Sequence, residues 1–329
     1  MIIKSTFKPA WWLANPHLQT IYPTLLRRRQ VPKLRREQIE LPDGDFLDLA
    51  WADAELTQDA PLVILLHGLG GGLNSAYAGG LLATFNQCGW RAVLMHFRGA
   101  GSEPNRLPRA YHSGDTEDVA YFLKLLTNRE PHSKKAIVGV SLGGNVLLKW
   151  LGESGFHSLV CAGVAVSVPF QLRVAADRMN QGFARIYQAY LLRQMRQIFA
   201  RKMQDDARNL PEAFNNLQAC HCFWTFDDQI TAPLHGFANV HDYYRVASSR
   251  QYLHKITTPT LIVHALDDPF MSPEVLPASS ELSKAVTLEL SEKGGHVGFI
   301  AGAMPGNPVY WLEKRIPEFL RQYIIQDSD

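Results

Sequence analysis

The stretch KAIVGVSLGGN, residues 135–145, carries a serine between glycines at the junction of two local patterns. The run KAIVGV is apolar and typical of a buried strand, whereas NVLLKWLGE, beginning at residue 145, is compatible with a helix. Gly139, Ser141 and Gly143 fit the pattern G-x-S-x-G. A strand that turns this tightly into a helix strains the serine backbone and leaves no room for a Cβ at the flanking positions. We therefore predict that Ser141 is a nucleophile; the alternative is a serine that serves only the turn.

A serine hydroxyl attacks a carbonyl group only when a base takes its proton, so the motif predicts a histidine held by an acid. In hydrolases with this turn, the acid follows a late strand and the histidine follows the last one. The apolar run at 259–266 leads into Asp267 and Asp268, and the run at 285–291 is followed by GGH, which ends at His296. We predict that His296 is the base and that Asp268 is the acid. Asp267 remains the alternative acid.

Acyl transfer also needs donors for the charge that develops on the carbonyl oxygen, and two backbone amides usually supply them. The glycine-rich loop HGLGGG, residues 67–72, follows the apolar run at 61–68. We predict that the amides of Leu69 and of Leu142, the residue after the serine, form this oxyanion hole. The loop lacks the Lys-Ser/Thr ending of a P-loop and does not match G-x-G-x-x-G, so we do not expect it to bind a nucleotide.

Strand-like runs alternate with helical patterns along the chain, which predicts an α/β fold with a mostly parallel central sheet and helices on both faces. The runs EQIEL and FLDLAWA flank a turn rich in Pro, Asp and Gly and predict an initial antiparallel pair. The last helix is expected to use Asn307 as its N-cap and Pro308 as its first residue. Buried strands are predicted at 61–68, 91–97, 135–141, 159–168, 259–266 and 285–291, and helices at 75–87, 114–128, 143–154 and 308–325.

Residues 1–329 are expected to form one domain with an insertion at about 170–250, because this interval between two strand runs is too long for a simple crossover. Its apolar residues at helical spacing predict a helical lid that packs on the domain beneath; a basic helix on a membrane surface is the alternative. Residues 1–36 are expected to form an arm in which the basic run 27–29 is solvated. The apolar stripe comprises Phe183, Tyr187, Tyr190, Leu191, Met195, Ile198 and Phe199.

Charge and cysteine content give no sign of a nucleic-acid partner, a disulfide scaffold or a zinc site. Lys and Arg number 33 against 31 Asp and Glu, so the overall charge demands neither nucleic acid nor an anionic membrane. The four cysteines are too sparse for a disulfide scaffold, and Cys220-His221-Cys222 lacks the spacing and the second pair of a zinc site. We expect no metal and no cofactor.

The N-terminal residues lack the pattern of a secretory signal, and the apolar run at 159–170 is shorter than the roughly 20 residues that span a bilayer. We expect a cytoplasmic protein without integral membrane segments, for which peripheral contact with a membrane stays open.

Several motifs together resemble the α/β-hydrolase superfamily: HG after the first core strand, HFRGAG after the second, G-x-S-x-G, DDP and GGH. More narrowly, NPHLQT (15–20), LPDGDFLDLAW (41–51), HFRG (96–99) with EPNR (103–106), and SVPFQL (167–172) resemble the bacterial YheT-like esterases over nearly the whole chain. The resemblance implies an α/β-hydrolase fold and a Ser-Asp-His carboxylic ester hydrolase.

The combined prediction is a serine esterase that cleaves a small-molecule ester, with an apolar acyl group, through an acyl-enzyme. The eukaryotic relatives of the family that this sequence resembles include lipases and medium-chain acyltransferases. One alternative is therefore acyl transfer to an alcohol through the same residues. A binding protein that keeps the fold without catalysis is another, because a fold alone does not establish an activity.

Overall fold

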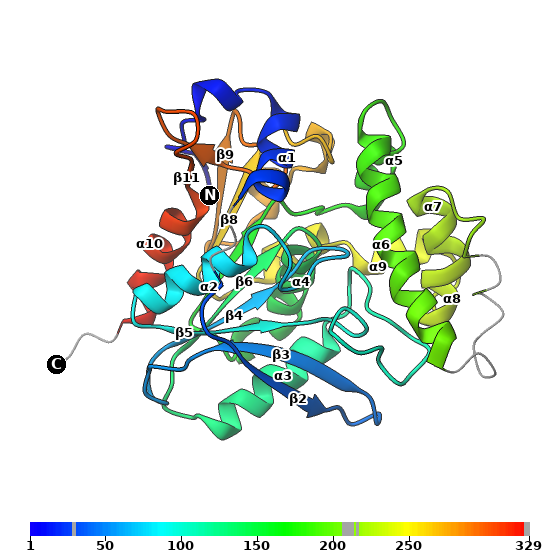
Figure 1. Ribbon diagram of the computed structural model, residues 1–329, viewed down its shortest axis with the longest axis horizontal. Coiled ribbons are helices and arrows are strands. Elements are labelled where there is room, and N and C mark those ends of the chain that lie inside the picture. Colours follow the sequence, from blue (N-terminus) through cyan, green and yellow to red (C-terminus); the bar gives the residue numbers. More distant parts are fainter. Residues whose placement is uncertain (28–30, 206–213, 215–216, 326–329) are drawn as a thin grey trace.

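A nine-stranded sheet forms the centre of the computed structural model, which describes residues 1–27, 31–205, 214 and 217–325 (Figure 1). The strand order is β1-β9-β8-β7-β6-β4-β5-β3-β2. Strands β2 and β3 pair antiparallel with each other, β3 pairs antiparallel with β5, and every other pair is parallel. The predicted mostly parallel sheet and the predicted antiparallel pair are both confirmed. The bounds are β1 Ile2–Lys4, β2 Arg35–Glu40, β3 Phe46–Ala52, β4 Leu62–Leu66, β5 Arg91–Met95, β6 Lys135–Val140, β7 Ala162–Val166, β8 Thr260–Ala265 and β9 Val286–Ser291.

Helices cover both faces of this sheet, and the alternation of side chains along each strand divides the core into two layers. On β4, Ile64 and Leu66 belong to the cluster that includes residues of α3 and α4, whereas Val63 and Leu65 belong to the cluster with α2 and α10. All five residues of β4 are fully buried, as expected for a strand with helices on both sides. The helices are α2 Ala78–Gln87, α3 Glu117–Arg129, α4 Leu142–Ser154 and α10 Leu312–Ile324.

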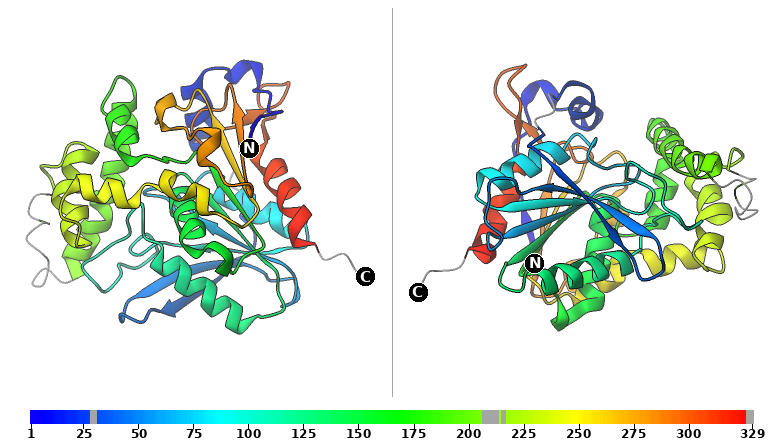
Figure 2. Two further views of the ribbon diagram at one scale, coloured as in Figure 1. Left: turned by 180° about the vertical axis from the view of Figure 1, so that it is seen from behind. Right: turned by 60° about the horizontal axis from the view of Figure 1, so that its bottom comes forward.

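The insertion between β7 and β8 is helical and stands at one end of the sheet (Figures 1 and 2). Met195, Ile198 and Phe199 of its long helix α6 are buried in the main core. On the same helix, Arg201 and Lys202 donate to backbone carbonyls within residues 99–109. These basic side chains therefore hold α6 on the domain beneath it. The elements are α5 Leu172–Met179, α6 Ala184–Asp205, α7 Phe223–Phe226, the π-helix η4 Asp227–Thr231, α8 Ala232–Leu234, α9 Val240–Ala247 and the 3-10 helix η5 Ser249–Lys255.

Two residues of the predicted apolar stripe, Phe183 and Tyr190, are 46% and 55% exposed, so the stripe is buried only in part. Among the described residues, no helix is long and apolar enough to cross a membrane.

The N-terminal segment, which the sequence predicted as an arm, contributes a strand and a helix to the fold. Strand β1 adds to the sheet beside β9, and α1, Pro16–Leu26, begins at the N-cap Asn15. Arg27 forms an ion pair with Glu313 and lies over the ring of Tyr310, with its side chain 10% exposed. The prediction of a solvated basic run is therefore wrong for Arg27, because a carboxylate and a ring are brought to it from the other end of the chain. Residues 28 and 29 of that run lie outside the described residues.

The last helix starts later than predicted. Val309 and Tyr310 form strand β11, Val309–Tyr310, which pairs antiparallel with β10, Ile300–Ala301. Helix α10 begins at Leu312, and Asn307 is not its N-cap. The pairing with β10 extends the backbone where local sequence favours a helix, so a long-range contact overrides the Asn-Pro signal.

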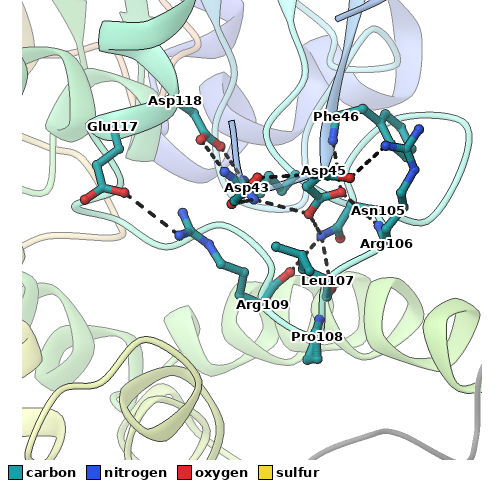
Figure 3. Close-up of polar contacts among 12 residues, drawn as sticks. Asp43, Asp45, Phe46, Asn105, Arg106, Leu107, Pro108, Arg109, Glu117 and Asp118 are labelled. Atoms are coloured by element: carbon teal, nitrogen blue, oxygen red, sulfur yellow. Dashed lines mark hydrogen bonds and ion pairs between the residues drawn. The ribbon is translucent and has the colours of Figure 1, made fainter. Parts of the chain in front are cut away.

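A buried ion-pair network fixes the loop that follows β5 (Figure 3). The Arg98 guanidinium donates to both oxygens of Asp118, each at 2.7 Å, and also to Asp43 and Asp45. Asn105 donates to Asp45 at 2.6 Å. The network joins the β2–β3 turn, the loop after β5 and the first turn of α3, which accounts structurally for Arg98 and Asn105 in the HFRG and EPNR motifs.

Candidate active site

Ser141 lies at the sharp turn between β6 and α4. Its backbone φ is +53°, in a region that residues with side chains rarely adopt. A Cβ on Gly139 would collide with the Gly143 carbonyl oxygen, and one on Gly143 would lie 2.6 Å from the carbonyl oxygens of Leu66 and His67. Both flanking positions of the motif therefore require glycine, because backbone passes directly beside them.

His296 lies in the loop after β9, and its imidazole faces the serine. Its Nε2 is 3.0 Å from Ser141 Oγ. The His296 amide donates to Thr20 Oγ1 at 2.9 Å. The ring of Phe270 stacks on the imidazole, with centroids 3.9 Å apart and planes inclined by 9°. Thr20 therefore holds the backbone of His296, and Phe270 packs on its imidazole.

Asp268 is the carboxylate that reaches this imidazole. Its Oδ2 is 2.8 Å from His296 Nδ1, and its Oδ1 accepts from the Phe270 amide at 2.9 Å. An ionised carboxylate only accepts, so Nδ1 carries the hydrogen and Nε2 is left to accept from the serine hydroxyl. Asp267 instead accepts from the Gly295 amide at 2.9 Å, and burial raises the pKa of its carboxyl. The structure thus brings Ser141, His296 and Asp268 together and leaves Asp267 to hold the histidine loop.

The glycine-rich loop after β4 is held by side chains that leave one amide unused. The amides of Gly68 and Gly70 donate to the hydroxyls of Tyr77 and Tyr111, at 2.9 and 2.7 Å. Between them, the Leu69 amide has no hydrogen-bond acceptor among the described residues.

His67 anchors the start of the same loop. Its Nε2 accepts from the Phe97 amide at 3.1 Å, so its Nδ1 carries the hydrogen and donates to the Gly68 carbonyl at 2.7 Å. Burial lowers the pKa of His67 to about 3, so the ring stays neutral and keeps this arrangement.

Leu142, the first residue of α4, supplies the second predicted amide. A first-turn amide has no partner inside its own helix, and the amide of Leu142 also has none elsewhere in the described part of the chain. Leu69 and Leu142 both line the pocket that contains Ser141 and His296. Two unused amides thus border the same cavity as the serine, as an oxyanion hole requires.

This pocket has a volume of about 110 Å³ and extends from the serine beneath the inserted helices. Its walls are mostly aliphatic and aromatic, with a group of polar residues contributed by the insertion and by the loop before α3. It is lined by Leu69, Tyr111, His112, Ser113, Ser141, Leu142, Pro169, Leu172, Ala175, Ala176, Met179, Leu191, Met195, Phe223, Phe226, Asp227, Thr231, Tyr243, Tyr244, Phe270, Met271 and His296. In the described residues, no three His, Cys, Asp or Glu side chains gather as a metal ion would need.

Three supporting residues were not predicted from sequence. Thr20 and Phe270 hold the histidine. Asn145, fully buried, donates to the carbonyls of Ser113 and Ala247 and accepts from the Ser249 amide. It therefore ties the helix after the serine to the end of the insertion. Asn145 lies two residues after the serine motif, but only its distant partners reveal what it does.

A comparison with protein-family models matches residues 61–303 to the alpha/beta hydrolase fold. The matched segment runs from the strand before the glycine-rich loop to beyond His296. The chain belongs to the α/β-hydrolase family. The resemblance stated from the motifs is confirmed.

Two relatives illustrate the range of this family. A protein of Escherichia coli, "Putative esterase YheT", is 45% identical over 319 residues, which cover 97% of this chain and 94% of the relative. The monoacylglycerol lipase of Saccharomyces cerevisiae is 30% identical over 258 residues, which cover 75% of this chain and 57% of that protein. Relatives with these names support a hydrolase activity.

Among solved structures, the Pyrococcus furiosus esterase Pf2001 has a TM-score of 0.57 at 17% identity, with 99% of each chain covered. At this identity, the likeness establishes the shared α/β-hydrolase fold.

Proposed function

We propose that the protein is a serine hydrolase that cleaves carboxylic esters through an acyl-enzyme, with Ser141 as nucleophile, His296 as base and Asp268 as its acid. The observation that carries this proposal is the continuous hydrogen-bonded chain from Ser141 Oγ through the His296 imidazole to Asp268 Oδ2, at 3.0 and 2.8 Å. The strained serine backbone and the two unused amides support the same assignment.

In the first step, His296 Nε2 takes the hydroxyl proton while Ser141 Oγ bonds to the ester carbonyl carbon. The carbonyl oxygen becomes negative and accepts from the amides of Leu69 and Leu142. Asp268 stabilises the imidazolium. The carbon–oxygen bond to the alcohol then breaks, and the proton on Nε2 passes to the departing alcohol oxygen.

In the second step, a water molecule gives a proton to His296 Nε2 as its oxygen bonds to the acyl carbon. The serine ester bond breaks, the proton returns to Ser141 Oγ, and the carboxylic acid leaves. An alcohol in place of water would give a new ester by the same sequence, so product analysis with ethanol present distinguishes hydrolysis from acyl transfer.

The pocket supports an apolar acyl group, because aliphatic and aromatic side chains such as Leu172, Met179 and Phe226 form much of its wall. The expected partner is therefore a small-molecule ester.

Hydrolysis of p-nitrophenyl esters by Ser141→Ala tests the assignment. We expect the rate to fall by on the order of 10⁴-fold or more, because the three residues act as a unit. Ser154→Ala, at the other end of the helix that Ser141 precedes, is the matched control and should keep the parent rate. An unchanged rate in Ser141→Ala would refute the proposed nucleophile.

A further inference from the structure

One wall of the pocket contains an acid that the proposed chemistry does not use. Asp227 is the first residue of the π-helix η4, and it lines the same pocket as Ser141. Short π-helical turns such as η4 occur frequently at functional sites. The carboxyl is reachable from the pocket, yet protein surrounds it so densely that burial raises its pKa to about 6.

The partners of Asp227 are two hydroxyl groups. Its Oδ1 accepts from Thr231 Oγ1 at 2.7 Å, and its Oδ2 accepts from the Tyr244 hydroxyl at 2.8 Å. In the described part of the chain, no Lys or Arg side chain forms an ion pair with it, and none contributes to its pKa shift. A carboxylate offers about four acceptor positions, so about two remain after these bonds. The buried charge of Asp227 is thus incompletely compensated in the free protein.

A neutral donor lies on the same wall. His112 Nδ1 accepts from the Gly114 amide at 3.1 Å, so the hydrogen is on Nε2, which has no partner among the described residues. Burial keeps the pKa of His112 well below its ordinary value. Its ring lies 5.6 Å from that of Tyr243, which is 5.4 Å from that of Tyr244. The polar wall, as we name this group, consists of His112, Asp227, Thr231, Tyr243 and Tyr244.

We propose that the polar wall is a subsite for a hydrogen-bond-donating group of the substrate, a hydroxyl or a protonated amine, bound by Asp227 several bonds from the scissile carbonyl. The inference rests on the proposed function and narrows its substrate class. A pocket for a wholly apolar ester gains nothing from an acid in its wall, because contact with an alkyl chain would remove water from the carboxylate and leave its free acceptor positions unpaired. A donor on the substrate fills one of these positions.

Paired substrates test this proposal. Rates are compared for p-nitrophenyl esters of plain, ω-hydroxy and ω-amino acids across a range of chain lengths, and for hexanoate esters of plain alcohols, diols and amino alcohols. We expect one donor-bearing series to exceed its plain counterpart in kcat/KM by about tenfold to a hundredfold at its best length, the range of a hydrogen bond to a charged group. Comparison of hydroxyl-bearing with amino-bearing esters shows whether the subsite recognises a hydroxyl or an ammonium group. Comparison of the modified acids with the modified alcohols shows whether that group lies on the acyl or the alcohol side of the ester.

Asp227→Asn should reduce this ratio of donor-bearing to plain ester to near unity. The matched control is Asp228→Asn, because Asp228 is the exposed neighbour and does not line the pocket; it should leave the ratio intact. Labelling of Ser141 by a fluorophosphonate checks that the Asp227→Asn pocket is folded. The proposal is overturned if no donor-bearing ester is favoured by the parent protein, or if the preference survives in Asp227→Asn. Loss of the preference with plain esters still cleaved through Ser141 would leave the proposed function standing.

The parent protein offers a second test that needs no variant. Protonation of Asp227 should diminish the preference as the pH falls below about 6. Any effect of pH that is common to the two esters cancels in the ratio. Among the titratable groups near Asp227, Cys220, Tyr243 and Tyr244 have pKa values raised by burial and stay protonated over this range. Burial lowers the pKa of His112 well below its ordinary value, so this ring stays neutral. A preference that is constant from pH 5 to pH 8 would contradict the role of the carboxylate.

Discussion

At the scale of single residues, the strained turn at Ser141 and the choice of carboxylate determine what the site can do. Asp267 and Asp268 are adjacent in sequence, yet only Asp268 contacts His296, while Asp267 accepts a backbone amide from the histidine loop. Backbone geometry at the end of β8 therefore assigns different tasks to two identical side chains.

Exchange of each aspartate for asparagine separates these tasks. Asp268→Asn should lower kcat by about 10⁴-fold, because an amide in that position favours the wrong imidazole tautomer and cannot stabilise the imidazolium. Asp267→Asn keeps a carbonyl oxygen to accept from the Gly295 amide, so its loss should be far smaller. Steady-state rates on one ester measure both, and a larger loss in Asp267→Asn would reverse the assignment.

The principal residues of the candidate site could be predicted because chemistry constrains them: a serine nucleophile needs a base, and the base needs an acid, at defined places after strands. The supporting residues could not be predicted in this way. Thr20 is 276 positions from His296, and nothing local to Thr20 indicates that its hydroxyl accepts the histidine amide. For Asp227 the sequence indicates only a residue of the insertion that shapes the lid or pocket, because its neighbours in the polar wall belong to a cavity formed by several elements.

At the scale of elements, α1 and the buried network after β5 position the site from outside. Thr20 connects α1 to the histidine loop through the His296 amide. Thr20→Val keeps the shape of the side chain and removes this acceptor, so it should cost about 1 kcal/mol of stability and lower kcat. Thr24→Val, one turn along the same helix at an exposed position, is the control. Unfolding in urea measures the change in stability, and ester hydrolysis measures the change in kcat. If Thr20→Val and Thr24→Val had equal stability and equal kcat, α1 would not support the histidine.

The network around Arg98 predicts a large loss of stability. Arg98→Met would leave the buried carboxylates of Asp118 and Asp45 without their cation and should cost about 3 to 5 kcal/mol. Arg106→Met removes an ion pair with Glu40 at the surface, where solvent screens the charges, and should change the unfolding midpoint little. Denaturant titration compares the two, and similar midpoints would contradict the structural importance of the buried network.

The Asn-Pro dipeptide occurs twice and shows where local signals fail. Asn15-Pro16 starts α1, with the Asn15 side chain accepting from two helix amides, although this helix was not predicted. Asn307-Pro308 carries the same signal, but the next residues enter a strand that pairs with β10. The two sites differ in their long-range partners, which the local sequence does not contain.

At the scale of the whole molecule, the sheet order and the two core layers follow from apolar runs that are legible in the sequence, which is why the α/β-hydrolase fold could be predicted. The edge strand β1 could not be predicted, because a three-residue strand becomes recognisable only through its pairing with β9. The pocket forms where the insertion meets the carboxyl ends of the central strands, so its wall reflects the packing of helices that are far apart in the chain.

The proposed mechanism obtains its base and its charge stabilisation from protein groups alone. Activity should therefore persist after dialysis against EDTA, with the same kcat/KM within experimental error. A loss that added divalent metal restores would require a different chemistry from the serine mechanism.

Covalent trapping tests the central claim most directly. The intact protein is treated with a fluorophosphonate, and peptide mass spectrometry locates the adduct. We predict one equivalent of label, attached to Ser141, with labelling greatly slowed in His296→Ala. An adduct on another residue, or an unreactive protein that still cleaves esters, would contradict the account.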